Sequence, residues 1–194
     1  MADIRPFLLD PFPMTQAFYF SITAQKPSAF NGENHPVESV SWLEAITCCN
    51  VLSGLAGLEK CYSGIEAESA LFHPEANGYR LPTEAEWEFA CRAGTTSARY
   101  GNLDEIGWYK ENSGGSTHPV GLKQPNTWGL FDMLGNVWEW CSDCYDEQVY
   151  GSYRIFRGGG WSDAERGCLA TNRRRSHPFS FKIDDLGFRL ARDL

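Results

Sequence analysis

The stretch from Arg80 to Gly94 reads RLPTEAEWEFACRAG and carries the signals of a helix at both of its ends. The Thr83 hydroxyl can accept a hydrogen bond from the Glu86 amide, and the Glu86 side chain can reach back to the Thr83 amide. This reciprocal arrangement is a capping box, which marks the beginning of a helix. Gly94 stands where helices commonly end in a left-handed conformation. The stretch therefore predicts a helix between Thr83 and Gly94.

One face of this predicted helix is apolar. Trp87, Ala90 and Cys91 recur at spacings of three and four residues, so they lie on the same side of the helix. An apolar stripe of this kind packs against a sheet or another helix. Cys91 is therefore predicted to be a core residue and not a reactive thiol.

Residues 39–54, SVSWLEAITCCNVLSG, predict a second helix with the same end signals. Ser41 and Glu44 form the capping box, and Gly54 stands at the expected C-terminal cap. This helix also has an apolar stripe that is predicted to be core, formed by Trp42, Ala45, Ile46 and Cys49.

The rest of the chain predicts short strands joined by long loops. The strands are expected where β-forming and aromatic residues cluster, at Trp138–Cys141, Tyr153–Arg157 and Gly187–Ala191. The segments between them are rich in Gly, Pro, Asn and Asp and show no sustained periodicity. No repeat or domain boundary is visible, so we expect one compact α+β domain over residues 1–194.

Composition excludes some classes of function. The chain has 194 residues with 42% hydrophobic content, which suits one sizeable core, and its net charge of −8 argues against a general nucleic-acid-binding surface. No stretch approaches the roughly 18 apolar residues of a membrane span. The opening segment MADIRPFLLDPFPM has no apolar region of signal-peptide length, so the sequence predicts a cytoplasmic location without a membrane partner.

The seven cysteines are scattered through apolar surroundings, and their odd number does not suit a disulfide framework. Reduced and mostly buried thiols are expected. Cys141 and Cys144 form one CxxC pattern, which would be half of a zinc site or a redox pair. A second CxxC or a suitably spaced pair of histidines is missing, so the structural interpretation is favoured.

Several long blocks of the sequence together resemble the formylglycine-generating-enzyme, or sulfatase-modifying-factor, family. The likeness covers roughly residues 10–194 and implies a variant of the C-type lectin fold, with two helices, a small twisted antiparallel sheet and much irregular structure. The blocks occur in family order: PVESVSWLEA (36–45), GYRLPTEAEWEFACRAG (78–94), GLFDMLGNVWEWCSD (129–143), FRGGGW (156–161) and LGFRLA (186–191).

The resemblance implies more than one function, because the family includes copper-dependent oxidases and ligand-binding variable proteins of diversity-generating retroelements. In the oxidases two cysteines bind cuprous copper, and their positions fall here on Asp163 and Cys168. A carboxylate is a poor substitute for a thiolate at Cu(I). Gly160 also stands where the family has a serine. Both differences argue against the copper oxidase.

The resemblance also implies a structural calcium site in the block FDMLGNVWEW. It places the side chains of Asp132 and Glu139 and the backbone carbonyls of Gly135 and Val137 around one ion. An all-oxygen ligand set with two carboxylates suits Ca²⁺. In the alternative interpretation, Asp132 and Glu139 cap turns and pair with arginine.

The charge balance reverses between residues 154 and 177. Six arginines in this segment face only Asp163 and Glu165, which is a pattern typical of a site for an anionic ligand or an acidic partner. Alternatively, several of the arginines point inward and hold loops. The separate Arg189, in LGFR, is expected to be structural.

We therefore expect a noncatalytic domain that binds a protein or small-molecule ligand, including an anionic one, through its C-terminal segment. The alternative is a divergent metal-dependent oxidoreductase that uses copper, Cys168 and Asp163 to oxidise a thiol substrate. A retroelement-diversified variable protein is a further option, although Asn172 is the only asparagine in the segment. The mixture of aromatic, charged and hydroxyl side chains predicts a recognition face formed by Trp161, Ser162, Asp163, Glu165, Arg166, Thr171, Arg173, Arg175, His177 and Phe179.

Overall fold

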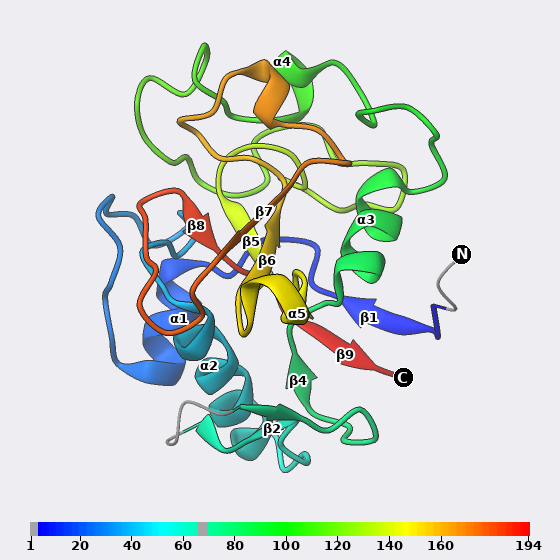
Figure 1. The fold of residues 1–194 in the computed structure, drawn as a ribbon. Helices are drawn as coiled ribbons and strands as arrows, with labels where there is room; N and C mark the ends of the chain where they lie inside the picture. Colours follow the sequence, from blue (N-terminus) through cyan, green and yellow to red (C-terminus); the bar gives the residue numbers. More distant parts are fainter. Residues whose placement is uncertain (1–3, 66–69) are drawn as a thin grey trace.

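The computed structural model describes residues 4–65 and 70–194 and has an α+β architecture (Figure 1). Its central element is a four-stranded sheet in the order β7-β6-β5-β8, in which β5 and β8 are parallel and the other pairs are antiparallel. The strands are β5 (Trp138–Cys144), β6 (Arg154–Arg157), β7 (Arg173–Ser176) and β8 (Leu186–Gly187).

Two smaller antiparallel sheets accompany the central one. The first has the order β1-β9-β4 and joins the N-terminal and C-terminal strands, and the second is the pair β2 and β3. Their bounds are β1 (Phe7–Leu9), β2 (Tyr62–Ser63), β3 (Leu71–Phe72), β4 (Tyr79–Arg80) and β9 (Ala191–Asp193).

Both predicted helices are present with their capping boxes. In the longer one Ser41 and Glu44 cap each other, and in the other Thr83 and Glu86 do so. The helices of the described residues are α1 (Gln16–Thr23), α2 (Trp42–Leu55), α3 (Glu84–Arg92), α4 (Leu103–Ile106) and α5 (Glu147–Tyr150), together with the 3₁₀ turn Glu165–Gly167.

The ends of the two helices differ slightly from the sequence-based expectation. The predicted cap at Gly54 is wrong, because α2 continues to Leu55 and the chain first becomes left-handed at Gly57, with φ +68°. In α3 the left-handed cap is Ala93, with φ 43°, and Gly94 follows with φ +90°. The sequence therefore located the C-terminal end of each helix to within a few residues.

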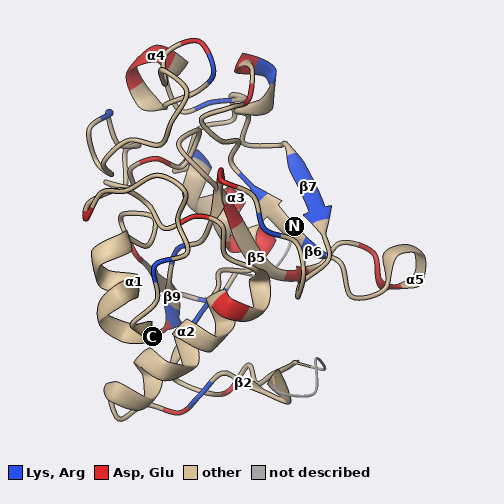
Figure 2. Ribbon diagram, turned by 90° about the vertical axis from the view of Figure 1, so that its left-hand side faces the viewer, with Lys and Arg blue, Asp and Glu red and all other residues tan. Residues whose placement is uncertain are grey.

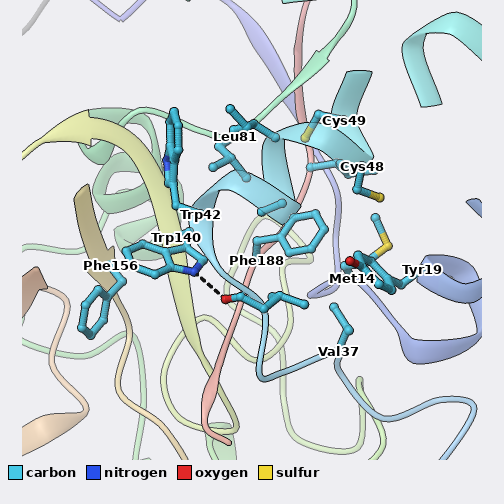
Figure 3. Close-up of a cluster of buried hydrophobic side chains, with 14 of the residues drawn as sticks. Met14, Tyr19, Val37, Trp42, Cys48, Cys49, Leu81, Trp140, Phe156 and Phe188 are labelled. Carbon is cyan, nitrogen blue, oxygen red and sulfur yellow. Dashed lines mark hydrogen bonds between the residues drawn. The ribbon is translucent and has the colours of Figure 1, made fainter. Parts of the chain in front are cut away.

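The central sheet separates two hydrophobic clusters, because alternate residues of a strand point to opposite faces. Trp138, Trp140 and Phe156 join the cluster formed with α1 and α2, part of which is shown in Figure 3. Cys141 and Ile155 join the other cluster, which packs against α3 and α4. Figure 1 shows α1 and α2 on one side of the sheet and α3 on the other.

The predicted apolar stripes of both helices are buried in these clusters, as expected. The Trp140 indole donates a hydrogen bond to the Val40 carbonyl at 3.0 Å, and the Trp42 indole donates one to the Cys141 carbonyl at 2.9 Å. These bonds satisfy the polar end of each buried ring, so both tryptophans fix the loop before α2 against β5.

The predicted strand at Gly187–Ala191 is wrong. The chain forms β8 and then leaves the central sheet, and β9 begins only at Ala191. Between them Arg189 points inward to Glu139, while the Phe188 and Leu190 carbonyls accept hydrogen bonds from Met14 and Asp10 of the N-terminal segment. Because β8 belongs to the central sheet and β9 to the sheet of β1 and β4, the segment crosses between two sheets.

Six of the seven cysteines are buried, Cys144 is half-buried, and all are free thiols. Cys141 and Cys144 thus form no disulfide. Among the described residues no helix is long and apolar enough to cross a membrane.

Candidate functional site

The glycine-rich turn after β6 is closely packed. Gly158 and Gly159 have φ values of +104° and +82°, which favour glycine. Gly160 is constrained by space instead, since a Cβ atom there would lie 2.8 Å from Asp185 Cβ and 2.9 Å from Asp185 Oδ2. The family's serine at this position is therefore incompatible with Asp185 where it lies here.

Asp163 holds this turn closed. Its Oδ2 atom accepts hydrogen bonds from the Trp138 indole at 2.6 Å and from the Gly160 amide at 3.0 Å, and its Oδ1 atom pairs with Arg174 at 2.8 Å. Both carboxylate oxygens are thus engaged by protein donors. We call residues 158–168, together with Asp185, the closed loop.

Cys168 lies at the end of the closed loop and is fully buried. Burial, followed by the negative charge of Asp163, raises the pKa of its thiol to about 12. The thiol is therefore protonated at neutral pH. Because nucleophilic chemistry requires the thiolate, this environment disfavours Cys168 as a nucleophile.

Glu139 and Arg189 form a fully buried ion pair at the inner end of β5. Arg189 donates to both carboxylate oxygens, at 2.7 and 2.6 Å, and the Trp87 indole donates to Oε2 at 2.7 Å. The expected structural role of Arg189 is confirmed by this geometry. Glu139 thus pairs with arginine, as the alternative to calcium binding predicts.

Asp132 is buried nearby and lacks an ion-pair partner among the described residues. Burial raises its pKa to about 6. Its Oδ2 atom accepts a 2.8 Å bond from the Gly121 amide, whereas Oδ1 accepts only a long bond of 3.4 Å from Asn136.

The four predicted calcium ligands therefore differ in whether their oxygen atoms are already held by hydrogen bonds or an ion pair. Within the described part of the chain, the Gly135 and Val137 carbonyls accept no hydrogen bond, and Asp132 Oδ1 is nearly free. Three ligands thus fit a hard cation, while Glu139 shares its charge with Arg189. No three His, Cys, Asp or Glu side chains gather among the described residues, so the calcium site remains a prediction.

The six arginines between residues 154 and 177 do not all have the same role. Some pair with the protein itself, as the inward-pointing interpretation predicts, and others could contact a ligand. Arg154 stacks over Trp42, and the buried Arg157 pairs with Glu84 and Glu88, so both point inward. Arg173 pairs with Glu84, and Arg174 pairs with Asp163. In contrast, no described carboxylate pairs with Arg166 or Arg175.

Arg175 is instead held between aromatic rings. Its guanidinium lies 4.5 Å from the Tyr145 ring centre and 3.8 Å from that of Tyr150. Tyr150 and Tyr153 are each 37% exposed. The aromatic contacts continue from Tyr153 to His177 and from His177 to Phe179. We call the surface formed by Tyr145, Tyr150, Tyr153, Arg173, Arg175, His177 and Phe179 the tyrosine–arginine face.

The predicted recognition residues thus do not form one continuous surface. The Trp161 indole donates to the Asp184 carbonyl and the Ser162 hydroxyl to Asp185, so these two residues belong with Asp163 to the closed loop. Glu165 pairs with Arg99 at its rim. Arg166 and Thr171 are exposed, and the remaining four lie on the tyrosine–arginine face: Arg173, Arg175, His177 and Phe179.

The three tyrosines of this face were missed by the sequence reasoning. They lie in CYDEQVYGSY, residues 144–153, which contains α5 and connects β5 to β6. Three tyrosines around one short turn were the available signal. The sequence could not show that β7, about twenty residues later, would place Arg175 against them.

Comparison with known proteins gives several matches. The sequence matches the family described as a sulfatase-modifying factor enzyme 1-like domain over residues 2–194. Chaperone protein LppX of Paenibacillus barcinonensis is 32% identical, and the match covers 95% of this chain and 78% of LppX. The formylglycine-generating enzyme of Streptomyces coelicolor is also 32% identical, over 82% of this chain and 53% of that enzyme, so the chain spans about half of its length.

A solved structure, Treponema denticola variable protein 1, is similar over nearly the whole chain. It has a TM-score of 0.87 and 33% sequence identity, and the match covers 97% of this chain and 84% of the variable protein. The α+β fold predicted from the sequence, of the sulfatase-modifying-factor and C-type lectin type, is confirmed by this likeness.

Proposed function

The chain belongs to the sulfatase-modifying factor enzyme 1-like family, and from this premise we propose that it is a noncatalytic binding domain. Its ligand is a protein or a small molecule, held by the C-terminal segment between Trp161 and Phe179. Fold alone does not decide this, because one scaffold carries several functions. The proposal depends on the chemistry of the site.

The observation that carries the proposal is the closed loop. Asp163 stands where the family resemblance implies a copper-binding thiolate, and its two oxygens already accept three hydrogen bonds. Cys168 is buried as a protonated thiol. Asp185 fills the space that a side chain at position 160 would need. Each position is thus used for packing and hydrogen bonding, which supports a structural role for the loop.

Copper titration and a turnover assay test this proposal. The protein is titrated with Cu(I) under a competing chelator and then incubated in air with a sulfatase-type cysteine peptide, with the Streptomyces coelicolor enzyme as positive control. We expect no stoichiometric copper binding and no aldehyde product in the peptide. Tight binding of one copper ion together with aldehyde formation would instead establish the divergent oxidoreductase that uses Cys168.

A structural calcium ion is part of the proposal. Asp132 and the carbonyls of Gly135 and Val137 would hold it, with Glu139 contributing from its pair with Arg189. The ion would neutralise the buried carboxylate of Asp132 and rigidify the turn before β5. Elemental analysis and melting with and without chelator test this site, and absence of both ion and stability loss would remove it.

The similarity to a Treponema variable protein supports a further specification, that the C-terminal segment is diversified by a retroelement. The DNA beside the gene provides the test. A near-copy of the 3′ end of the gene next to a reverse transcriptase would establish diversification. If both are absent, the binding segment is encoded as a fixed sequence.

A further inference from the structure

The edge of the central sheet at β7 is available for pairing. β7 pairs with β6 on one side, and no described strand pairs with it on the other. Figure 2 shows β7 in blue at the outer side of the sheet. A free edge presents unpaired backbone N–H and C=O groups, to which an extended peptide can add as a further strand.

The side chains of β7 alternate between two faces of the sheet. Arg174 points to the face of Trp138, where it pairs with Asp163. Arg173 and Arg175 point to the opposite face, where both lie over Tyr145. Arg173 is neutralised there by two hydrogen bonds to Glu84. Arg175 is thus the cation of this strand that has no carboxylate partner among the described residues.

Two tyrosine rings preorganise the Arg175 side chain for ligand binding. Tyr145 and Tyr150 hold the guanidinium by cation–π contacts, and no carboxylate of the described residues pairs with it. A held side chain loses less conformational entropy when it binds, so an arriving carboxylate meets a preorganised, planar donor group. A buried pair such as Arg157 with Glu88 cannot do this, because its charge is already compensated.

We propose that the tyrosine–arginine face binds an acidic, extended peptide segment of a partner protein. The segment adds as a strand to the free edge of β7 and places a carboxylate on Arg175. This inference rests on the proposed binding function and names its ligand class. Charge complementarity carries it: the chain has a net charge of −8, yet β7 begins with three consecutive arginines, of which two pair with carboxylates and one has no carboxylate partner within the part of the chain that the structure describes.

The geometry also predicts the pattern of the peptide. In a paired strand, the side chain opposite Arg175 would lie about 5 Å away on the same face, within reach of the guanidinium. Neighbouring positions on that face would contact the exposed rings of Tyr150 and Tyr153. An acidic residue opposite Arg175, with a fully extended backbone on both sides of it, therefore fits this edge, and a peptide with Glu at alternate positions offers one in several registers.

Fluorescence anisotropy with defined peptides tests the inference. The probe is a labelled eight-residue peptide of alternating Glu and Thr, and its first control replaces every Glu by Gln. A second control keeps the Glu residues but carries N-methyl groups on alternate amides, which removes strand pairing without changing charge. We expect the Glu probe to bind and each control to bind at least about fivefold more weakly, as the loss of one exposed charge pair or of edge hydrogen bonds implies.

Variants locate the contact. Arg175→Gln should weaken binding of the Glu probe about fivefold. Arg192→Gln is the matched control, because Arg192 also lies over a tyrosine ring, that of Tyr79, but on a different sheet. It should leave the affinity unchanged. Equal binding of the N-methylated peptide, or equal weakening by both variants, would overturn strand addition at β7.

The outcomes also separate this inference from the proposed function. If the Glu probe does not bind and the turnover assay is negative, the acidic-peptide inference is wrong while the noncatalytic function stands. If the turnover assay is positive, the noncatalytic function is wrong whatever the peptide does. Charge-selective binding with a negative turnover assay supports both.

Discussion

The closed loop and the tyrosine–arginine face are built from similar residues but differ in whether their charged side chains have partners of opposite charge. In the closed loop Asp163 accepts three hydrogen bonds, from an indole, an amide and a guanidinium. On the tyrosine–arginine face Arg175 has two aromatic rings and no described carboxylate. Asp163 and Arg175 themselves lie in the same C-terminal segment, so the difference is local.

This difference indicates where the segment can act on another molecule. A carboxylate whose two oxygens are both hydrogen-bonded, as in Asp163, gains little from a ligand, and removal of one of its donors costs stability. A stacked cation without a counter-ion gains from a ligand and contributes little to folding. This contrast supports the proposals that the closed loop serves as framework and that the neighbouring edge strand binds the ligand.

The largest expected effect comes from the ion pair beneath the closed loop. Glu139→Gln leaves the buried guanidinium of Arg189 without its counter-charge, which should cost about 3–5 kcal/mol in the free energy of unfolding. Urea denaturation in EDTA measures the loss. The control is Glu165→Gln, which breaks an exposed pair with Arg99 and should cost less than about 1 kcal/mol. Equal effects would show that the framework does not depend on this pair.

Asp132→Asn should change the pH dependence of stability. Burial raises the pKa of Asp132 from 3.8 to about 6, so the folded state favours the protonated form. Its contribution to stability is present below pH 4 and is lost as the pH rises to 6, where ionisation of the buried group costs about 3 kcal/mol. In EDTA the variant should therefore match the wild type at pH 4 and exceed its stability at pH 7.

Calcium should reverse this comparison. An ion bound at Asp132 favours the ionised carboxylate, so added Ca²⁺ should raise the melting temperature of the wild type at pH 7 and raise that of Asp132→Asn less, because the neutral amide oxygen is a weaker ligand. Other buried acids, such as Asp185, titrate alike in both proteins and cancel in the difference. The same response in both proteins would place any calcium effect elsewhere in the molecule.

Gly160→Ser tests whether the closed loop is filled. The added side chain would meet Asp185 Cβ at 2.8 Å, and overpacking of this kind costs about 1–3 kcal/mol. Removing the obstacle in Gly160→Ser/Asp185→Ala should recover part of the loss. Gly54→Ser is the matched control, because the nearest atom there is Lys60 Cε at 3.8 Å. Thermal denaturation that shows no loss for Gly160→Ser would mean that the family's serine could return without rearrangement.

Two of the helices, α2 and α3, could be predicted from the sequence because their signals are local, whereas α1, α4 and α5 were missed. The capping boxes at Ser41 and Thr83 lie within four residues of chain and are found as expected. The segment after Gly187 could not be read in this way. Its break into β8 and β9 depends on Glu139 and on the N-terminal segment, which are far away in the sequence.

The site could be predicted only in part, because some of its features depend on residues that are far apart in the sequence. Alignment with the family blocks identified Asp163 and Gly160 as the unusual positions, but not Asp185 as the residue that fills the vacant space. Composition detected the surplus of arginine, yet it could not distinguish the inward-pointing Arg157 from the stacked Arg175. That distinction depends on α3, which supplies the carboxylates to Arg157, and on the connection between β5 and β6, which supplies the tyrosine rings to Arg175.

The smallest expected effect on stability is that of Arg175→Ala. The substitution removes two cation–π contacts at a half-buried site and breaks no ion pair, so it should cost about 0.5–1 kcal/mol. The same protein should bind the Glu probe about fivefold more weakly, because its ligand-directed cation is gone. Denaturation and anisotropy measured on this one variant therefore separate the two roles. If Arg175→Ala destabilised the fold as much as Gly160→Ser, Arg175 would belong to the framework like Asp163, and the contrast between the two regions would fail.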